Sequence, residues 1–252
     1  MAFLIAVLGL TVGSFLNVCI YRIPKQQSIV SPGSRCPRCG NRLAWFELIP
    51  VCSYLLLKGR CRSCRAPVPG RYLLVEVLTG AVFYLEYTRL GSSQDFLTMA
   101  FLSSIMIVAA FIDLDHRIIP NRIVLFGLVS GIVLGLISAK AGVAFMALGM
   151  TTGFGLLLLV AVISRGQMGM GDVKIAAVMG VFLGWQAVLL AIFFAFSGGG
   201  LYGLFLIVFR GKSRKTAVPF GPFLALGTII TINWSAQIIS WYLNFVIKLY
   251  IG

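Results

Sequence analysis

The segment Gly169-Met170-Gly171-Asp172-Val173-Lys174 places an acidic side chain directly before a long apolar run. Ionisable residues are costly in a bilayer and usually mark function there. The two glycines remove side chains from the approach to Asp172, so another backbone, such as a substrate strand, has room to come close. A second acidic segment, residues 111–121, reads Phe-Ile-Asp-Leu-Asp-His-Arg-Ile-Ile-Pro-Asn and also lies between two apolar runs. We interpret the two segments as halves of one site.

The apolar runs on either side of these segments decide the fold class. Hydrophobic residues make up 59% of the chain and charged residues 11%, with a mean hydropathy of +0.98, whereas about a quarter of an ordinary soluble domain is charged. We therefore predict an all-α polytopic membrane protein. Eight runs reach or approach the ~20 residues of a spanning helix: 1–21, 72–88, 96–112, 119–138, 142–163, 173–185, 187–209 and 218–247. The sixth run is short, and the last is long enough to contain a break near Gly227 or Asn233. Seven or nine spans are therefore the alternatives.

Residues 22–71 interrupt the apolar pattern with ten Lys/Arg, one acidic residue and five of the six cysteines. We predict that they form the one extramembrane domain, between a first helix (1–21) and a helix bundle (72–252). If the N-terminus is outside, eight spans place eighteen of the 21 basic residues on the cytoplasmic side and leave Arg89, Lys140 and Lys248 outside. Such a bias is what the positive-inside rule expects of a polytopic membrane protein. The net charge of +14 therefore gives little support to a nucleic-acid partner.

The first run lacks the charge pattern and cleavage site of a signal peptide, so we expect the helix to be retained.

Glycines at four-residue spacing predict close contacts between helices, because small residues allow two backbones to approach. These glycines are Gly127, Gly131 and Gly135, Gly149 with Gly153, Gly180 with Gly184, and Gly199 with Gly203.

Four cysteines have the spacing of a metal site. Cys36 and Cys39 form one C-x2-C pair, and Cys61 and Cys64 form a second pair after 21 intervening residues. Four thiolates suit tetrahedral zinc, and they leave no open position for catalysis, so the metal is predicted to be structural. Two disulfides are the alternative, which a reducing cytosol disfavours. Cys19 and Cys52 lack this spacing and are expected to act as small apolar residues.

The acidic residues of segment 111–121 cannot all face one site. Asp113 and Asp115 are two residues apart, so on a continuous helix they point about 200° apart. We expect Asp113 to face the bundle and Asp115 to pair with Arg117 at the interface. Asp113 and Asp172 then reach the same cytoplasmic depth, which suits an acid–base pair. A proton-coupled carrier that uses the two as a relay is the alternative. His116, the one histidine, is expected to be a solvated helix cap.

Six motifs in order resemble the bacterial type IV prepilin peptidases. They are Gly13-Ser-Phe-Leu-Asn-Val18 with Tyr21-Arg-Ile-Pro24, the paired C-x2-C, Trp45-Phe-Glu-Leu-Ile-Pro50, Arg71-Tyr-Leu-Leu-Val-Glu76, residues 113–121, and Gly169 through Lys174. Beyond these, Pro219-Phe-Gly-Pro222 fits the family's last cytoplasmic loop.

The resemblance implies a polytopic aspartyl protease. Such enzymes remove the short basic leader of prepilins or pseudopilins after a glycine, at the cytoplasmic face, and many also methylate the new N-terminus with S-adenosylmethionine. Matched by position, the resemblance implies catalytic aspartates at Asp113 and Asp172 and metal-binding cysteines at Cys36, Cys39, Cys61 and Cys64. For methyl transfer, Glu47 and the Gly59 loop are the candidates. Glu47, Asp115 or anionic membrane lipid is expected to attract the basic leader.

Overall fold

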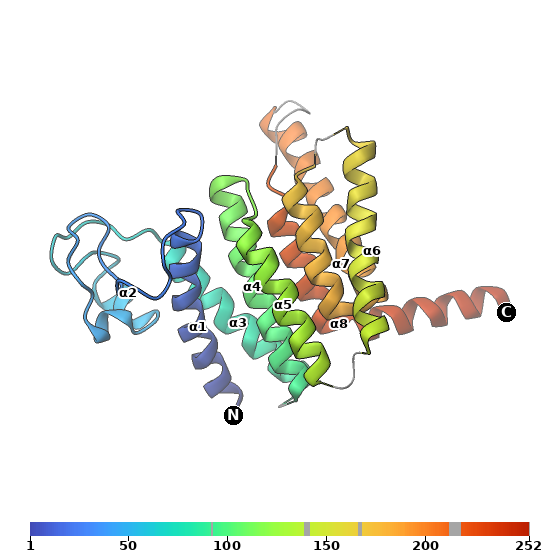
Figure 1. Cartoon of the computed structure of the whole chain (residues 1–252), viewed down its shortest axis with the longest axis horizontal. Coiled ribbons are helices and arrows are strands. Elements are labelled where there is room, and N and C mark those ends of the chain that lie inside the picture. Colours follow the sequence, from blue (N-terminus) through green and yellow to red (C-terminus); the bar gives the residue numbers. More distant parts are fainter. Residues whose placement is uncertain (92, 139–141, 166–167, 212–217, 252) are drawn as a thin grey trace. The chain divides into compact units, whose positions relative to one another are not determined.

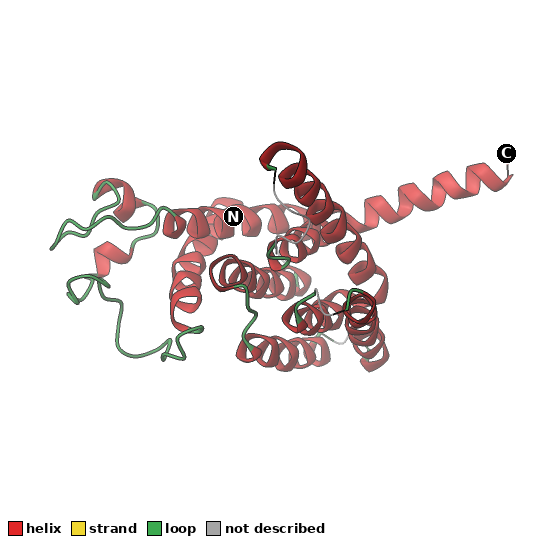
Figure 2. Ribbon diagram, turned by 90° about the horizontal axis from the view of Figure 1, so that it is seen from above, coloured by secondary structure: helices red, strands yellow, loops and turns green. Residues whose placement is uncertain are grey.

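The structure is a computed structural model that describes residues 1–91, 93–138, 142–165, 168–211 and 218–251. Within these residues it contains helices and loops and no strand (Figure 2). The long helices are α1 (Ala2–Arg22), α3 (Arg71–Leu90), α4 (Gln94–His116), α5 (Asn121–Ile137), α6 (Val143–Ile163), α7 (Met170–Arg210) and α8 (Gly221–Ile251) (Figure 1). A 3-10 helix, η1 (Trp45–Leu48), and a short helix, α2 (Cys52–Leu56), lie in the polar region between α1 and α3.

Each apolar run predicted from the sequence is helical, which confirms the all-α class. Among the described residues, five helices are long and apolar enough to cross a membrane: α1, α4, α6, α7 and the Gly221–Asn244 part of α8. Helix α5 is apolar but has only 17 residues. Helix α8 continues through Gly227 and Asn233, so the alternative of a break at those positions is not observed. Of the basic residues used for the topology, Lys140, Lys212, Arg214 and Lys215 lie outside the described residues.

Helix α7 contains the sixth and seventh predicted runs, and the chain turns back between them at Gly184. This glycine has φ 74° and ψ 176°, which are not helical values and which a residue without Cβ tolerates. A Cβ built on Gly153 would touch both the Ala176 carbonyl and Val188. On a straight helix those two residues would be about 18 Å apart. The two arms of α7 therefore run in opposite directions, and both of its ends lie at the same end of the unit (Figure 1).

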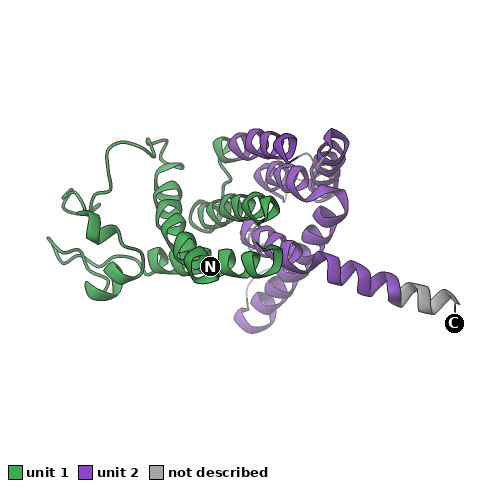
Figure 3. Cartoon of the chain, turned by 90° about the horizontal axis from the view of Figure 1, so that it is seen from below, with its two compact units in different colours: residues 1–123 green, residues 124–252 purple. Residues whose placement is uncertain are grey.

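The chain divides into two compact units, residues 1–123 and residues 124–252 (Figure 3). In the first unit α1 packs closely on α3, where a Cβ on Gly9 would come 2.8 Å from the Cα of Gly80. The second unit brings α6 and the first arm of α7 into backbone contact at Gly149 and Gly180. The contact between Gly149 and Gly180 confirms the predicted role for these two of the spaced glycines. Gly203 is an exception, because a Cβ there would meet nothing within 4 Å.

Candidate functional site

The two cysteine pairs form two similar turns. In the first turn the Cys36 amide donates to the Asn41 carbonyl at 2.9 Å, and the Gly40 amide donates to the Cys36 carbonyl at 2.9 Å. In the second, the Cys61 amide donates to Ala66 and the Arg65 amide donates to Cys61, at 2.8 and 2.9 Å. The residue after each pair has a positive φ, 71° at Gly40 and 57° at Arg65. Both turns therefore bend the backbone around their own sulfur atoms.

The four sulfur atoms converge on one point. Those of Cys36, Cys39, Cys61 and Cys64 all lie within 4.8 Å of one another, and the Sγ atoms of Cys36 and Cys64 are 3.8 Å apart. A tetrahedral zinc with Zn–S bonds of about 2.3 Å separates its sulfur ligands by about 3.8 Å. All six cysteines are described and none forms a disulfide. The donor set and its spacing therefore fit one tetrahedral metal ion, as the sequence predicts.

The local environment also prepares one of the four cysteines, Cys36, as a ligand. Backbone hydrogen bonding from Cys39, and next from Arg38, lowers the pKa of the Cys36 thiol to about 6, which favours the thiolate form that binds metal. Asn41 Nδ2 donates to Ser63 Oγ at 2.6 Å and so connects the two turns. This contact links two residues for which sequence reasoning gave no role.

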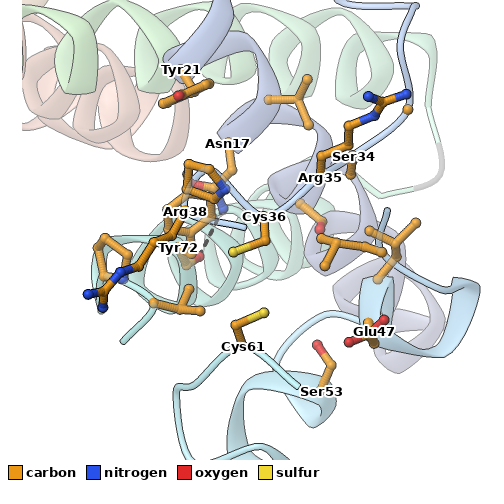
Figure 4. A pocket seen from close by; sticks show the side chains of 18 of the residues that line it. Asn17, Tyr21, Ser34, Arg35, Cys36, Arg38, Glu47, Ser53, Cys61 and Tyr72 are labelled. Atoms are coloured by element: carbon orange, nitrogen blue, oxygen red, sulfur yellow. Dashed lines mark hydrogen bonds between the residues drawn. The ribbon is translucent and has the colours of Figure 1, made fainter. Parts of the chain in front are cut away.

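A cavity of about 860 Å³ lies between the cysteine domain and helices α1 and α3 (Figure 4). Cys36 and Cys61 form part of one wall, so the cavity adjoins the candidate metal centre. Glu47 and Gly59, the two residues suggested for methyl transfer, both line it. Glu47 Oε2 accepts a hydrogen bond from the Ala44 amide at 2.8 Å and caps η1. The structure therefore brings the cysteines and both methyl-transfer candidates to one place.

Hydrogen bonds from helices α1 and α3 hold the cavity together. Asn17 Nδ2 on α1 donates to the Tyr72 carbonyl on α3 at 2.9 Å. Glu76 on α3 accepts a 2.8 Å hydrogen bond from the Val51 amide, at the start of α2. The second contact attaches the cysteine domain to α3. Asn17 and Glu76 belong to motifs that carry the family resemblance, but no role was predicted for either residue from the sequence.

Asp113 and Asp115 have different environments. Asp113, in the last turn of α4, is 6% exposed, whereas Asp115 is exposed. Asp115 pairs with Arg71 at the start of α3, so the predicted pairing with Arg117 is wrong. Arg117 instead ends α4 in the left-handed conformation, and its amide donates to the Asp113 carbonyl at 2.8 Å. The ion pair places this end of α4 beside the junction of α3 with the cysteine domain.

Asp172 lies in the first turn of α7, in the second unit. It is 9% exposed. Its amide donates to the Gly169 carbonyl at 3.1 Å, and a Cβ on Gly169 would lie only 3.2 Å from Asp172 Oδ2. Gly169 therefore leaves space beside this carboxylate, as the sequence suggested. Exposed His116 ends α4, which agrees with a solvated cap.

Two family models match the chain. The bacterial peptidase A24 N-terminal domain matches residues 7–90, and the type IV leader peptidase family matches residues 100–204. A protein of Bacillus subtilis is 34% identical, with 94% of this chain and 96% of the relative covered. The chain belongs to the type IV leader peptidase family. This confirms the resemblance found in the sequence.

Other members of the type IV leader peptidase family are similarly related. A Pseudomonas aeruginosa protein is 34% identical over 94% of this chain and 92% of its own length. A Myxococcus xanthus protein is 41% identical over 82% of this chain, and the match spans 63% of that longer relative. All three relatives are called prepilin leader peptidase/N-methyltransferase. No solved structure matches the chain.

Proposed function

We propose that this protein is a prepilin leader peptidase and N-methyltransferase in which Asp113 and Asp172 are the catalytic pair. The observation that carries the proposal is that both aspartates are buried at helix ends in a chain of the type IV leader peptidase family. The substrates are prepilins or pseudopilins, whose basic leader is removed at the cytoplasmic face. The carrier alternative has no support from the relatives, all named as peptidases.

The positions of the two aspartates suggest different roles. Peptide hydrolysis by two carboxylates needs one that is ionised, to take a proton from water, and one that is protonated, to polarise the peptide carbonyl. Asp172 lies in the first turn of its helix, where the partial positive charge of the N-terminus stabilises a carboxylate. Asp113 lies in the last turn of α4, where the partial charge is negative. We assign Asp172 as the general base and Asp113 as the general acid.

The proposal includes a topology. We place the N-terminus outside, residues 22–71 in the cytoplasm and eight spans in the inner membrane, with the two arms of α7 as separate spans. The reversal at Gly184 supports this count, because it returns the chain to the end where α7 begins. The ten basic residues of the cysteine domain support its cytoplasmic side.

Two cofactors belong to the proposal. Zinc held by the four cysteines would stabilise a domain with few buried side chains, because metal binding supplies folding free energy. S-adenosylmethionine would supply the methyl group for the new N-terminus. For the basic leader, anionic membrane lipid remains the candidate attractor, since Asp115 is already paired with Arg71 and Glu47 lines a cavity rich in arginines.

The test is cleavage of a peptide that carries a basic leader, a glycine and an apolar helix. Asn nearly preserves the volume of Asp but cannot exchange a proton, so Asp113→Asn and Asp172→Asn should each fold and lose nearly all cleavage. The double variant should be little worse than either single variant, because the pair acts as a unit. Asp115→Asn is the matched control and should keep more activity than Asp113→Asn. Cleavage by both single variants at the wild-type rate would rule out the aspartyl mechanism.

A further inference from the structure

The cavity beside the cysteine cluster contains a buried acceptor that the protein leaves unsatisfied. Asn17 is 2% exposed and lines the cavity. Its Nδ2 donates to the Tyr72 carbonyl, whereas Oδ1 has no hydrogen-bond partner among the described residues. Leaving a buried polar atom unpaired costs about 1–3 kcal/mol. A ligand with a hydrogen-bond donor at this position would remove that cost.

The charged lining restricts what the ligand can be. Within the described residues the cavity is lined by two glutamates, Glu47 and Glu76, and by more arginines, namely Arg22, Arg35, Arg38, Arg60 and Arg62. The excess of arginines disfavours the basic leader of a prepilin. The glutamates and the unsatisfied acceptor disfavour a simple phosphate, which brings negative charge and few donors. The lining instead fits a molecule that carries a carboxylate, a positive charge and a neutral donor.

The two ends of the cavity differ in polarity. Asn17 lies at one end with Tyr21, one turn further along α1, and Glu47 and Ser53 lie at the other (Figure 4). Val18 adds an apolar side chain beside Asn17. A neutral amide near a tyrosine suits a flat heterocycle with an amino group, whereas a carboxylate suits an ammonium or sulfonium group. The volume is within the range of about 300–1,000 Å³ that is typical of small-molecule sites.

We propose that this cavity is the S-adenosylmethionine site and that Asn17 Oδ1 accepts a hydrogen bond from the amino group of the adenine ring. The inference rests on the proposed methyl transfer and deepens it. The arginines would attract the α-carboxylate, and Glu47 would lie toward the cationic part of the molecule. Asn17 is thus a residue that determines specificity for the ligand, and it also connects α1 to α3.

Calorimetric titration of the purified full-length protein with S-adenosylhomocysteine tests the site. Asn17→Ala should weaken binding about tenfold, the effect of one lost hydrogen bond. Asn233→Ala is a matched control, because Asn233 is also buried, donates through Nδ2 to a backbone carbonyl and has an unpaired Oδ1 among the described residues, but belongs to α8 and does not line the cavity. It should change the affinity less than twofold. Equal affinities in the two variants would overturn the assignment.

The position of the adenine ring has its own test. S-inosylhomocysteine, which has an oxygen in place of the adenine amino group, should bind the wild type about tenfold more weakly than S-adenosylhomocysteine. Asn17→Ala should bind the two ligands within twofold of each other. A full tenfold preference retained by Asn17→Ala would refute the contact.

Asn17→Ala also loses the hydrogen bond to Tyr72, so its weaker binding can have a folding defect as its cause. A third measurement therefore uses the wild type alone. Ultraviolet cross-linking of radiolabelled S-adenosylmethionine to the wild type should label peptides within residues 14–76. Labelling within the second unit instead would overturn the site alone. If the wild type bound neither S-adenosylhomocysteine nor S-adenosylmethionine while still cleaving the peptide, the site and the methyl-transfer half of the proposed function would both fail, and the peptidase half would stand.

Discussion

Replacing one cysteine of the cluster should remove most of the bound metal. The Sγ atoms of Cys36 and Cys64 are 3.8 Å apart, and the edge of a regular tetrahedron is about 1.63 times the distance from its centre to a vertex, so the implied metal–sulfur distance is about 2.3 Å, the value for zinc. Zinc sites of this kind supply about 10–16 kcal/mol. Divided equally over four thiolates, one ligand contributes roughly 3 kcal/mol, on the order of a hundredfold in affinity.

The assay combines metal analysis with X-ray absorption spectroscopy. Wild-type protein should contain about one zinc with four sulfur neighbours at about 2.3 Å. Cys64→Ser should lose most of this zinc after dialysis against a weak chelator. Cys52→Ser is the control, because Cys52 is equally exposed and lies in the same domain outside the cluster. The reasoning is refuted if Cys64→Ser keeps the wild-type zinc content, or if the spectrum shows nitrogen or oxygen neighbours in place of sulfur.

Two further predictions concern the helices. Gly180→Leu should destabilise the second unit by about 1–3 kcal/mol or more, because a Cβ there would meet the Gly149 backbone. Thermal unfolding measures this loss of stability. Gly155→Leu is the control and should change the stability little, because a Cβ there would meet nothing within 4 Å. A similar fall in both variants would contradict the packing argument. A cysteine at Gln94, at the exposed start of α4, should react with an impermeant thiol reagent in intact cells, whereas labelling of a cysteine at Lys58 instead would invert the topology.

Short-range patterns were sufficient for much of the fold and site. The two C-x2-C turns are stabilised by hydrogen bonds within six residues of each cysteine, so the spacing in the sequence predicts them directly. Asp113 and Asp115 separate into a buried and an exposed residue because an α-helix turns about 200° in two residues. The partner of Asp115 could not be predicted in the same way, since Arg71 is 44 residues away.

The sequence by itself determined the membrane class, the helical segments and the candidate metal ligands, because hydropathy, helical periodicity and cysteine spacing act over a few residues. Only the tertiary structure decided where those segments meet. The reversal at Gly184 depends on a backbone angle that many glycines can adopt but few do. The hydrogen bond from Asn17 to Tyr72 spans 55 residues, and the cavity exists only where α1, α3 and the cysteine domain come together. Contacts of this range depend on the packing of whole helices, which no local pattern encodes.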